Sequence, residues 1–252
     1  MKYESFAKNG FEVVKASNIE KLNEIKNIIF SKSIETLKKN NLKSPDDFFN
    51  NFHKLNLKGH ALNNFRMDII KTLKEKDTLK LIFEAYEETI LGLIGPDILV
   101  QKSCNLVIQQ PNDKDYVLTH QDAPVNSPFE IVLWVPLVNI FNTKGMYILD
   151  SKKSRIANDI LKEKKEHSYF QDYSEKNAEF SNINYGSSLV FWTGLIHGCL
   201  MNKEDETRWT LNIRFKSLYS PCGHKDPLEF FRVLKMSPLS QIALKSQEVD
   251  LI

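Results

Sequence analysis

Residues 208–218, with the sequence RWTLNIRFKSL, contain a clearly alternating pattern of apolar and polar residues. Leu211, Ile213 and Phe215 occupy every second position of this stretch. Since successive side chains of a β-strand point to opposite faces, the alternation predicts a strand with one apolar and one polar face. The polar face consists of Arg208, Thr210, Asn212 and Arg214. A polar inner face of this kind is typical of a barrel strand that lines an active site.

Short apolar runs between turn residues predict further strands upstream of residue 208. They lie at 98–109, 116–120, 130–138, 146–149, 188–191 and 196–201, with a helical segment at 156–165. The first 95 residues favour helices instead, because their apolar residues recur at helical spacing until Gly95-Pro96. Helices followed by many strands indicate helices packed outside a β core. We therefore expect a mainly β protein of one domain, with a helical part at 1–95, a β core at 96–220 and a helical tail at 221–252.

The composition bounds the class of protein. The chain of 252 residues can form one domain with a sizeable core, and its net charge of +2 indicates neither a nucleic-acid groove nor a membrane patch. Cys104, Cys199 and Cys222 are odd in number and form no C-x-x-C, which favours free thiols in a reducing compartment. The first residues lack the pattern of a secretion signal, and no apolar run approaches the ~18 residues of a membrane span. We expect a cytoplasmic protein without nucleic-acid or membrane partners, and the sequence leaves the oligomeric state open.

A candidate metal site begins at His120-Gln121-Asp122, where the i, i+2 spacing puts both end side chains on one face of a strand. His197 lies on a distant predicted strand and can complete a set of two imidazoles and one carboxylate. Such a set holds Fe(II) in non-haem oxygenases and leaves the opposite face of the octahedron open. A lone histidine is more often an ordinary core or surface residue, but the ordered set favours His120, Asp122 and His197 as catalytic metal ligands.

With these residues the sequence resembles the Fe(II)/2-oxoglutarate-dependent oxygenases, specifically the phytanoyl-CoA dioxygenase-like superfamily. Within it, the chain is most similar to the branch from carbohydrate and aminoglycoside biosynthetic clusters, including the streptomycin-cluster type. The family pattern is H-x-D, a long gap, H-G and an Arg eleven residues after the second His. It is matched, in a resemblance that covers residues 95–220, by His120, Asp122, His197, Gly198 and Arg208.

The resemblance implies a double-stranded β-helix, or jelly-roll, core, which periodicity alone does not distinguish from another sandwich or barrel. It implies Fe(II) and 2-oxoglutarate as cofactors and O2 as a further substrate. It also implies that a small molecule, such as a sugar or aminocyclitol, is hydroxylated or otherwise oxidised with release of succinate and CO2.

The resemblance also assigns cosubstrate contacts. Arg208 is the expected anchor for the far carboxylate of 2-oxoglutarate, because a guanidinium binds a carboxylate bidentately, and Arg214 is the competing candidate. Gln101 and Asn105, on the strand before the metal-binding turn, are further candidates for binding 2-oxoglutarate or substrate. Asp122 stands where the related halogenases have Gly or Ala, which favours oxygen transfer over halogenation.

Some residues and functions stay open to two interpretations. Trp134 and Trp192 are either cavity walls or simple core, and Lys152 and Lys153 either meet an anionic substrate or belong to a solvated turn. One alternative function is a metal enzyme of other chemistry on a cupin-like barrel, which would normally carry an H-x-H that this sequence lacks. The other is a non-catalytic metal- or sugar-binding protein, against which the intact set of candidate ligands argues.

Overall fold

The computed structural model describes residues 2–38, 44–123, 125–224 and 227–246, and its strands form two antiparallel sheets. The strands of the larger sheet are β1 (Phe11–Lys15), β2 (Ile98–Gln101), β3 (Asn105–Gln109), β4 (Glu130–Pro136), β7 (Ser187–Trp192), β9 (Arg208–Ser217) and β10 (Phe231–Lys235). Their order is β1-β7-β4-β9-β2-β10, and β3 pairs with β9 beside β2. The smaller sheet contains β5 (Met146–Ile148), β6 (Glu179–Phe180) and β8 (His197–Cys199), in the order β6-β5-β8.

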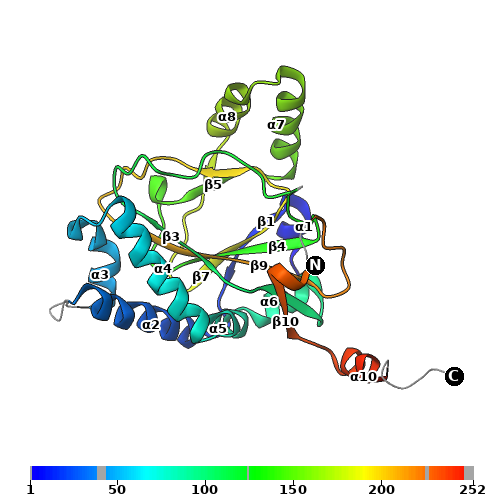
Figure 1. Cartoon of the computed structure of the whole chain (residues 1–252). Helices are drawn as coiled ribbons and strands as arrows, with labels where there is room; N and C mark the ends of the chain where they lie inside the picture. Colours follow the sequence, from blue (N-terminus) through cyan, green and yellow to red (C-terminus); the bar gives the residue numbers. More distant parts are fainter. Residues whose placement is uncertain (1, 39–43, 124, 225–226, 247–252) are drawn as a thin grey trace.

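Helices cover one face of the larger sheet, and a helical pair projects from the opposite side of the molecule, above β5 (Figure 1). The covering helices are α2 (Ile19–Leu37), α3 (Pro45–Asn51), α4 (Gly59–Glu75), α5 (Thr78–Ala85) and α6 (Glu87–Ile94). The projecting pair is α7 (Ser151–Lys164) and α8 (His167–Lys176). The remaining helices are α1 (Glu4–Asn9), η1 (Phe52–Leu55), η2 (Asn142–Lys144), α9 (Pro227–Phe230) and α10 (Pro238–Ser246). In the ranges that the structure describes, no helix is both long and apolar enough to cross a membrane.

Strand β9 lies at the centre of the larger sheet, and aromatic packing fixes which way its side chains point. Trp209 is fully buried among helix residues, with its ring centroid 4.9 Å from those of Phe49 and Phe52. Its indole N–H donates to the carbonyl of Phe49 at 3.0 Å, so the ring buries no unpaired donor. Because neighbouring side chains alternate, this packing turns Arg208 and Thr210 toward the other face, away from the helices.

Many of the expected elements are confirmed. The helices over the first 95 residues form, and Ser44 caps α3 by accepting a hydrogen bond from the Asp47 N–H at 3.2 Å. Expected strands at 130–138, 146–149, 188–191, 196–201 and 208–218 correspond to β4, β5, β7, β8 and β9. The expected helix at 156–165 corresponds to α7, which begins earlier because Asp150 accepts a hydrogen bond from the Lys153 N–H and caps it.

Other expectations need correction, and the architecture is a mixed helix-and-sheet one rather than mainly β. The strand expected at 98–109 is two strands, β2 and β3, which pair with different parts of β9. Residues 116–120 form no strand, and His120 makes an isolated bridge to His197 instead.

The two flanking regions also differ from the expectation. The helical part at 1–95 contains β1, which pairs with β7, and the tail expected to be helical at 221–252 contains β10, which pairs with β2. Each strand has only five residues, so its pairing depends on distant partners and leaves little periodic signal. The last residues of the tail, 247–252, lie outside the described residues.

Candidate metal centre

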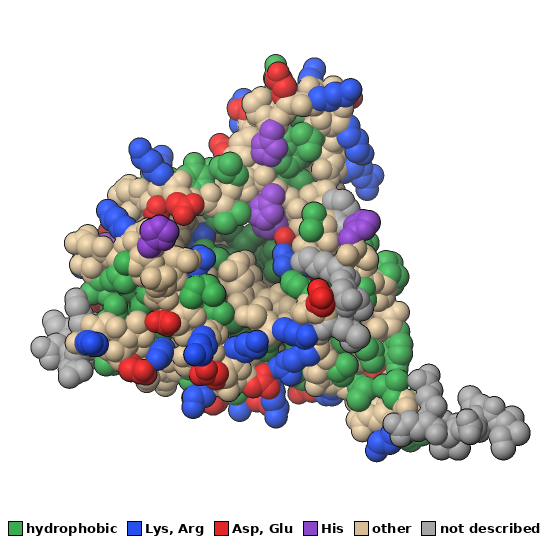
Figure 2. Space-filling model, viewed as in Figure 1, with side chains coloured by type: hydrophobic (Ala, Val, Ile, Leu, Met, Phe, Trp, Pro, Cys, Tyr) green, Lys and Arg blue, Asp and Glu red, His purple; other side chains and the backbone are tan. Residues whose placement is uncertain are grey.

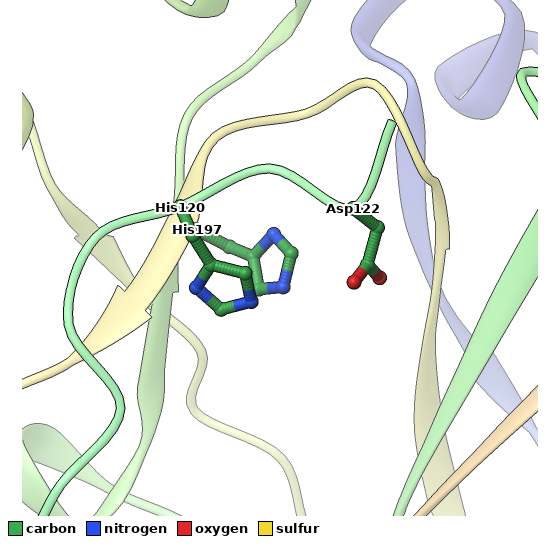
Figure 3. A group of neighbouring side chains, drawn as sticks. All are labelled: His120, Asp122 and His197. Carbon is green, nitrogen blue, oxygen red and sulfur yellow. The ribbon is translucent and has the colours of Figure 1, made fainter. Parts of the chain in front are cut away.

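Three side chains that could hold a metal ion meet between the two sheets. His120, Asp122 and His197 each offer one ligand atom, and these atoms lie within 4.8 Å of one another. Figure 3 shows the two imidazole rings side by side and the carboxylate facing them. The ring centroids are 4.2 Å apart. Among the described residues, no second group of three or more such side chains comes as close together.

Backbone hydrogen bonds hold the two histidines together. The N–H of His120 donates to the carbonyl of His197, and the N–H of His197 donates to the carbonyl of His120, both at 2.9 Å. The N–H of Asp122 donates to the carbonyl of Thr193 at 3.1 Å, so the turn that carries it lies on the loop after β7. Gly198 permits the close approach of the chain before His120, because a Cβ at this position would lie 3.1 Å from Cα of Thr119 and 2.6 Å from the Tyr147 hydroxyl oxygen.

The hydrogen bonds of the two imidazoles leave one nitrogen of each ring for a metal. Nδ1 of His120 lies 2.8 Å from the carbonyl of Leu118, and Nδ1 of His197 lies 3.0 Å from the carbonyl of Leu195. A carbonyl only accepts, so each Nδ1 carries the proton and each Nε2 keeps its lone pair. This arrangement orients metal-binding histidines in other proteins.

His197 is neutral at ordinary pH. Burial, followed by the nearby His120, lowers the pKa of His197 to about 4. Its ring also contacts Phe191, with the centroids 4.8 Å apart, and the side chain is almost entirely enclosed. Since a metal binds the neutral imidazole, the site does not have to release a proton from His197 before a metal binds.

Asp122 is paired with Arg214. Nη2 of Arg214 donates to Oδ1 of Asp122 at 2.7 Å, and the two side chains are 24% and 12% exposed. This bond fixes one carboxylate oxygen and leaves the other to face the imidazoles. Arg214, the competing candidate for the cosubstrate anchor, thus pairs with a candidate metal ligand and also lines the cavity.

The three side chains open into a cavity of about 150 Å³ between the sheets. Figure 2 shows a hollow on this face of the molecule, below the α7–α8 pair, with hydrophobic and basic side chains around it. The cavity is lined by Gln101, Asn105, Val107, Val117, His120, Asp122, Val132, Trp134, Met146, Phe191, His197, Gly198, Cys199, Arg208, Thr210, Asn212 and Arg214. All four members of the predicted polar face of β9 line the cavity, as the alternation of that strand indicated.

Arg208 lies deep in the cavity and has unused bonding capacity. It is 2% exposed, and its Nη1 donates to Sγ of Cys199 at 3.2 Å. Its Nε is buried without a hydrogen-bond partner in the described part of the chain, and so is the hydroxyl of Thr210, two residues further along β9. Unsatisfied buried polar atoms are rare in proteins, and where they line a cavity they can be satisfied by a polar ligand, an ion or water.

Gln101 and Asn105, the two other residues predicted to bind 2-oxoglutarate or substrate, differ in how much of their bonding capacity is free. The Gln101 side chain lines the cavity, but its amide donates to the backbone carbonyls of Ser103 and Asn212 and accepts from the N–H of Arg214. It therefore ties β2 to β9 and has little capacity left for a ligand. Asn105 is exposed at the cavity.

Of the aromatic and basic residues left open by the sequence, one lines the cavity and the others do not. Trp134 lines the cavity, whereas Trp192 is 36% exposed and donates its indole N–H to the carbonyl of Pro128. Trp192 is therefore not a cavity wall. Lys152 and Lys153 lie in the first turn of α7, outside the cavity lining, and Lys153 pairs with Glu179.

Cys199 lines the cavity but was not among the residues predicted to do so. Cys199 follows His197 by two positions on β8, so its side chain points to the same face. That spacing was visible in the sequence and could have found it.

Comparisons with known proteins place the fold among non-haem oxygenases. No protein-family model matches the chain, and no curated protein matches its sequence. The fold is similar to that of the non-haem monooxygenase ThoJ in its apo form, with 16% identity, 97% of this chain and 92% of that chain covered, and a TM-score of 0.59. It is also similar to AviO1 from Streptomyces viridochromogenes Tue57, with 17% identity, coverage of 87% and 95%, and a TM-score of 0.51.

A third similar structure is SnoK, described as a non-haem alpha-ketoglutarate-dependent carbocyclase from nogalamycin biosynthesis. Its identity is 11%, the coverage is 91% of this chain and 94% of that chain, and the TM-score is 0.51. At these identities the similarity concerns the fold, and the chemistry of this chain has to be argued from its own residues.

Proposed function

We propose that this chain is a single-domain Fe(II)- and 2-oxoglutarate-dependent oxygenase with a jelly-roll core, of the phytanoyl-CoA dioxygenase-like superfamily. The observation that carries the proposal is the combination, in one cavity, of the His120–Asp122–His197 group and the deeply buried Arg208, which has no anionic partner among the described residues. The first is a donor set for Fe(II), and the second suits a carboxylate.

The residues present fit both groups. Two imidazoles and a carboxylate would bind Fe(II) through the Nε2 atoms of His120 and His197 and an oxygen of Asp122. Arg208 would hold the far carboxylate of 2-oxoglutarate through Nε and an Nη, with the Thr210 hydroxyl as a further donor. Cys199, which contacts Arg208, is two residues from His197 on β8, about 7 Å along the strand. The anchor and the metal group therefore face the same small space.

Each residue has a separate part in the proposed reaction. When bound, iron and 2-oxoglutarate supply the activation of O2 that oxidises a substrate C–H bond and releases succinate and CO2. Arg214 keeps Asp122 in one orientation, and the backbone carbonyls of Leu118 and Leu195 do the same for the two imidazoles. Val132, Phe191 and Met146 exclude water from the space around the ligand group.

The proposed substrate is a small molecule, with a sugar or aminocyclitol as the finer proposal. Asn105 and the side-chain oxygen of Asn212, which has no described hydrogen-bond partner, offer polar contacts at the cavity. Hydroxyl or amino groups of a substrate would complement these amides. We propose a cytoplasmic location, in keeping with three free cysteines.

The decisive experiment is an anaerobic titration of the purified chain with Fe(II) and 2-oxoglutarate. Chelation of the iron by the keto acid is expected to give a weak visible charge-transfer band, and addition of O2 is expected to give succinate. A cupin-like enzyme or a sugar-binding protein would give neither signal. If the charge-transfer band and succinate are both missing, the proposed function is wrong.

A substitution at Asp122 tests the choice of oxygen transfer over halogenation. We expect Asp122→Gly to abolish substrate oxidation while 2-oxoglutarate still binds, because both imidazoles and Arg208 remain. Chloride would find an open position beside Arg214, which has lost its carboxylate partner. The measurements are product analysis and the charge-transfer band, with and without chloride. Chlorination of a substrate by the unmodified chain would refute the inference that Asp122 favours oxygen transfer over halogenation.

A substitution at Arg214 separates orientation of a metal ligand from anchoring of the cosubstrate. We expect Arg214→Gln to weaken Fe(II) binding by about tenfold, the lower end for a residue that orients a metal ligand. The expected loss of Fe(II) affinity is no larger because removing the positive charge of Arg214 also removes its repulsion of the metal ion. The affinity for 2-oxoglutarate should change much less than in an Arg208 variant. A larger loss of 2-oxoglutarate affinity than in Arg208→Ala would move the anchor to Arg214.

A further inference from the structure

Cys199 lies at the proposed cosubstrate end of the cavity, and the proposed function gives it no part. It is 6% exposed, and the cavity reaches it. Its Sγ accepts the hydrogen bond from Arg208 Nη1 at 3.2 Å. The thiol therefore stands beside the guanidinium at the place where the far carboxylate of 2-oxoglutarate is proposed to bind.

Within the described ranges, the buried guanidinium of Arg208 is paired with no carboxylate. A thiol is only a weak acceptor, and Nε of Arg208 has no hydrogen-bond partner among the described residues. The carboxylate of Asp122, which also lines the cavity, pairs with Arg214 instead. An anionic group on the sulfur of Cys199 would lie beside Arg208, to which the sulfur is already hydrogen-bonded.

We propose that Cys199 is a site of oxidation to a sulfinic acid, and that the resulting sulfinate pairs with Arg208 and blocks 2-oxoglutarate. This inference rests on the proposed function, because it takes Arg208 as the cosubstrate anchor. A sulfinate carries two oxygens on one atom, as a carboxylate does, and so suits the same planar fork. It occupies the anchor in competition with 2-oxoglutarate.

Hydrogen peroxide is the oxidant in this proposal. One molecule breaks its O–O bond, transfers an oxygen atom to the thiol and leaves as water, which gives the sulfenic acid. A second molecule does the same and gives the sulfinic acid. Each step oxidises the sulfur by two electrons and reduces peroxide to water, and the sulfinic acid releases its proton to solvent.

The other two cysteines serve as internal controls. Cys104 lies outside the cavity lining, and burial raises the pKa of its thiol to about 12, which keeps it in the unreactive form. Cys222 is partly exposed and contacts Nζ of Lys216 at 3.3 Å. Its oxidation should not depend on 2-oxoglutarate, because it lies outside the cavity lining.

The first test is peptide mass spectrometry of the full chain after exposure to hydrogen peroxide. Zn(II) replaces iron, because it has no redox chemistry of its own. We expect addition of two oxygen atoms at Cys199, and we expect 2-oxoglutarate with Zn(II) to suppress this addition without changing that at Cys222. An unmodified Cys199 under conditions that oxidise Cys222, or oxidation of Cys199 that 2-oxoglutarate does not slow, would overturn the inference.

The second test imitates the oxidised state with a matched pair of variants. Cys199→Asp places a carboxylate beside Arg208, and Cys199→Asn places a neutral group of nearly the same size there. We expect the Kd of 2-oxoglutarate, measured calorimetrically with Zn(II), to rise at least about tenfold in Cys199→Asp, because two anions compete for one guanidinium. We expect Cys199→Asn to stay near the unmodified chain.

The outcomes separate the two proposals. If the unmodified chain with Zn(II) binds no 2-oxoglutarate, the proposed function fails and this inference fails with it. If the unmodified chain binds 2-oxoglutarate and Cys199→Asp binds it equally well, this inference alone is wrong. Should Cys199→Asp fail to fold, the peroxide-treated chain that carries the sulfinate gives the same comparison. The Kd of 2-oxoglutarate for this oxidised chain should also rise at least about tenfold.

Discussion

His197→Ala is expected to abolish 2-oxoglutarate turnover and to weaken Fe(II) binding by more than about 100-fold, the upper end for a change in a residue that only orients a ligand. The side chain is a proposed direct ligand, it is almost fully enclosed, and its low pKa keeps it ready to bind a metal. Its removal leaves one imidazole and one carboxylate, which no longer define a face of the octahedron.

Folding of this variant has to be shown separately, because His197 also pairs with His120 through the backbone. Those two hydrogen bonds use main-chain atoms, so the substitution keeps them. Circular dichroism and thermal melting are the checks, and His167→Ala, outside the cavity lining, is the matched control. Succinate formation at the normal rate by a folded His197→Ala chain would refute the assignment of the metal ligands.

Arg208→Ala is expected to raise the KM for 2-oxoglutarate by at least about tenfold while Fe(II) binding stays nearly intact. The side chain is buried, so its removal would leave a desolvated carboxylate without a counter-charge. That loss costs on the order of 2–5 kcal/mol. Fe(II) binding should be affected little, because the hydrogen bond described for Arg208 goes to Cys199 rather than to a candidate metal ligand.

Two further variants make the comparison specific. Arg208→Lys should recover only part of the affinity, since an ammonium cannot reproduce the planar fork of a guanidinium. Arg214→Gln removes a guanidinium from the other end of the same strand face. Titration of the charge-transfer band with 2-oxoglutarate in all three variants measures the affinity directly. Unchanged affinity in Arg208→Ala would place the anchor elsewhere.

The candidate site could be found from the sequence because its parts are short and local. His120 and Asp122 are two residues apart, although they lie on an isolated bridge and the turn after it rather than on the expected strand. The alternation along β9 put Arg208, Thr210, Asn212 and Arg214 on one face, which the structure turns toward the cavity. The alternation of side chains along a strand depends on the strand's own sequence and does not depend on which strand pairs with it. The helices of the first 95 residues were readable for the same reason.

Only the tertiary structure determined which strands pair with each other and which contacts residues of the same type make. Five-residue strands such as β1 and β10 exist only because β7 and β2 supply their hydrogen bonds. Gln101 and Asn105 looked alike in the sequence, yet the amide of Gln101 is used by the backbone of β9. Likewise Arg208 meets Cys199 and Arg214 meets Asp122. The contacts of Gln101 and Arg214 join residues far apart in the chain, and no local spacing encodes such contacts.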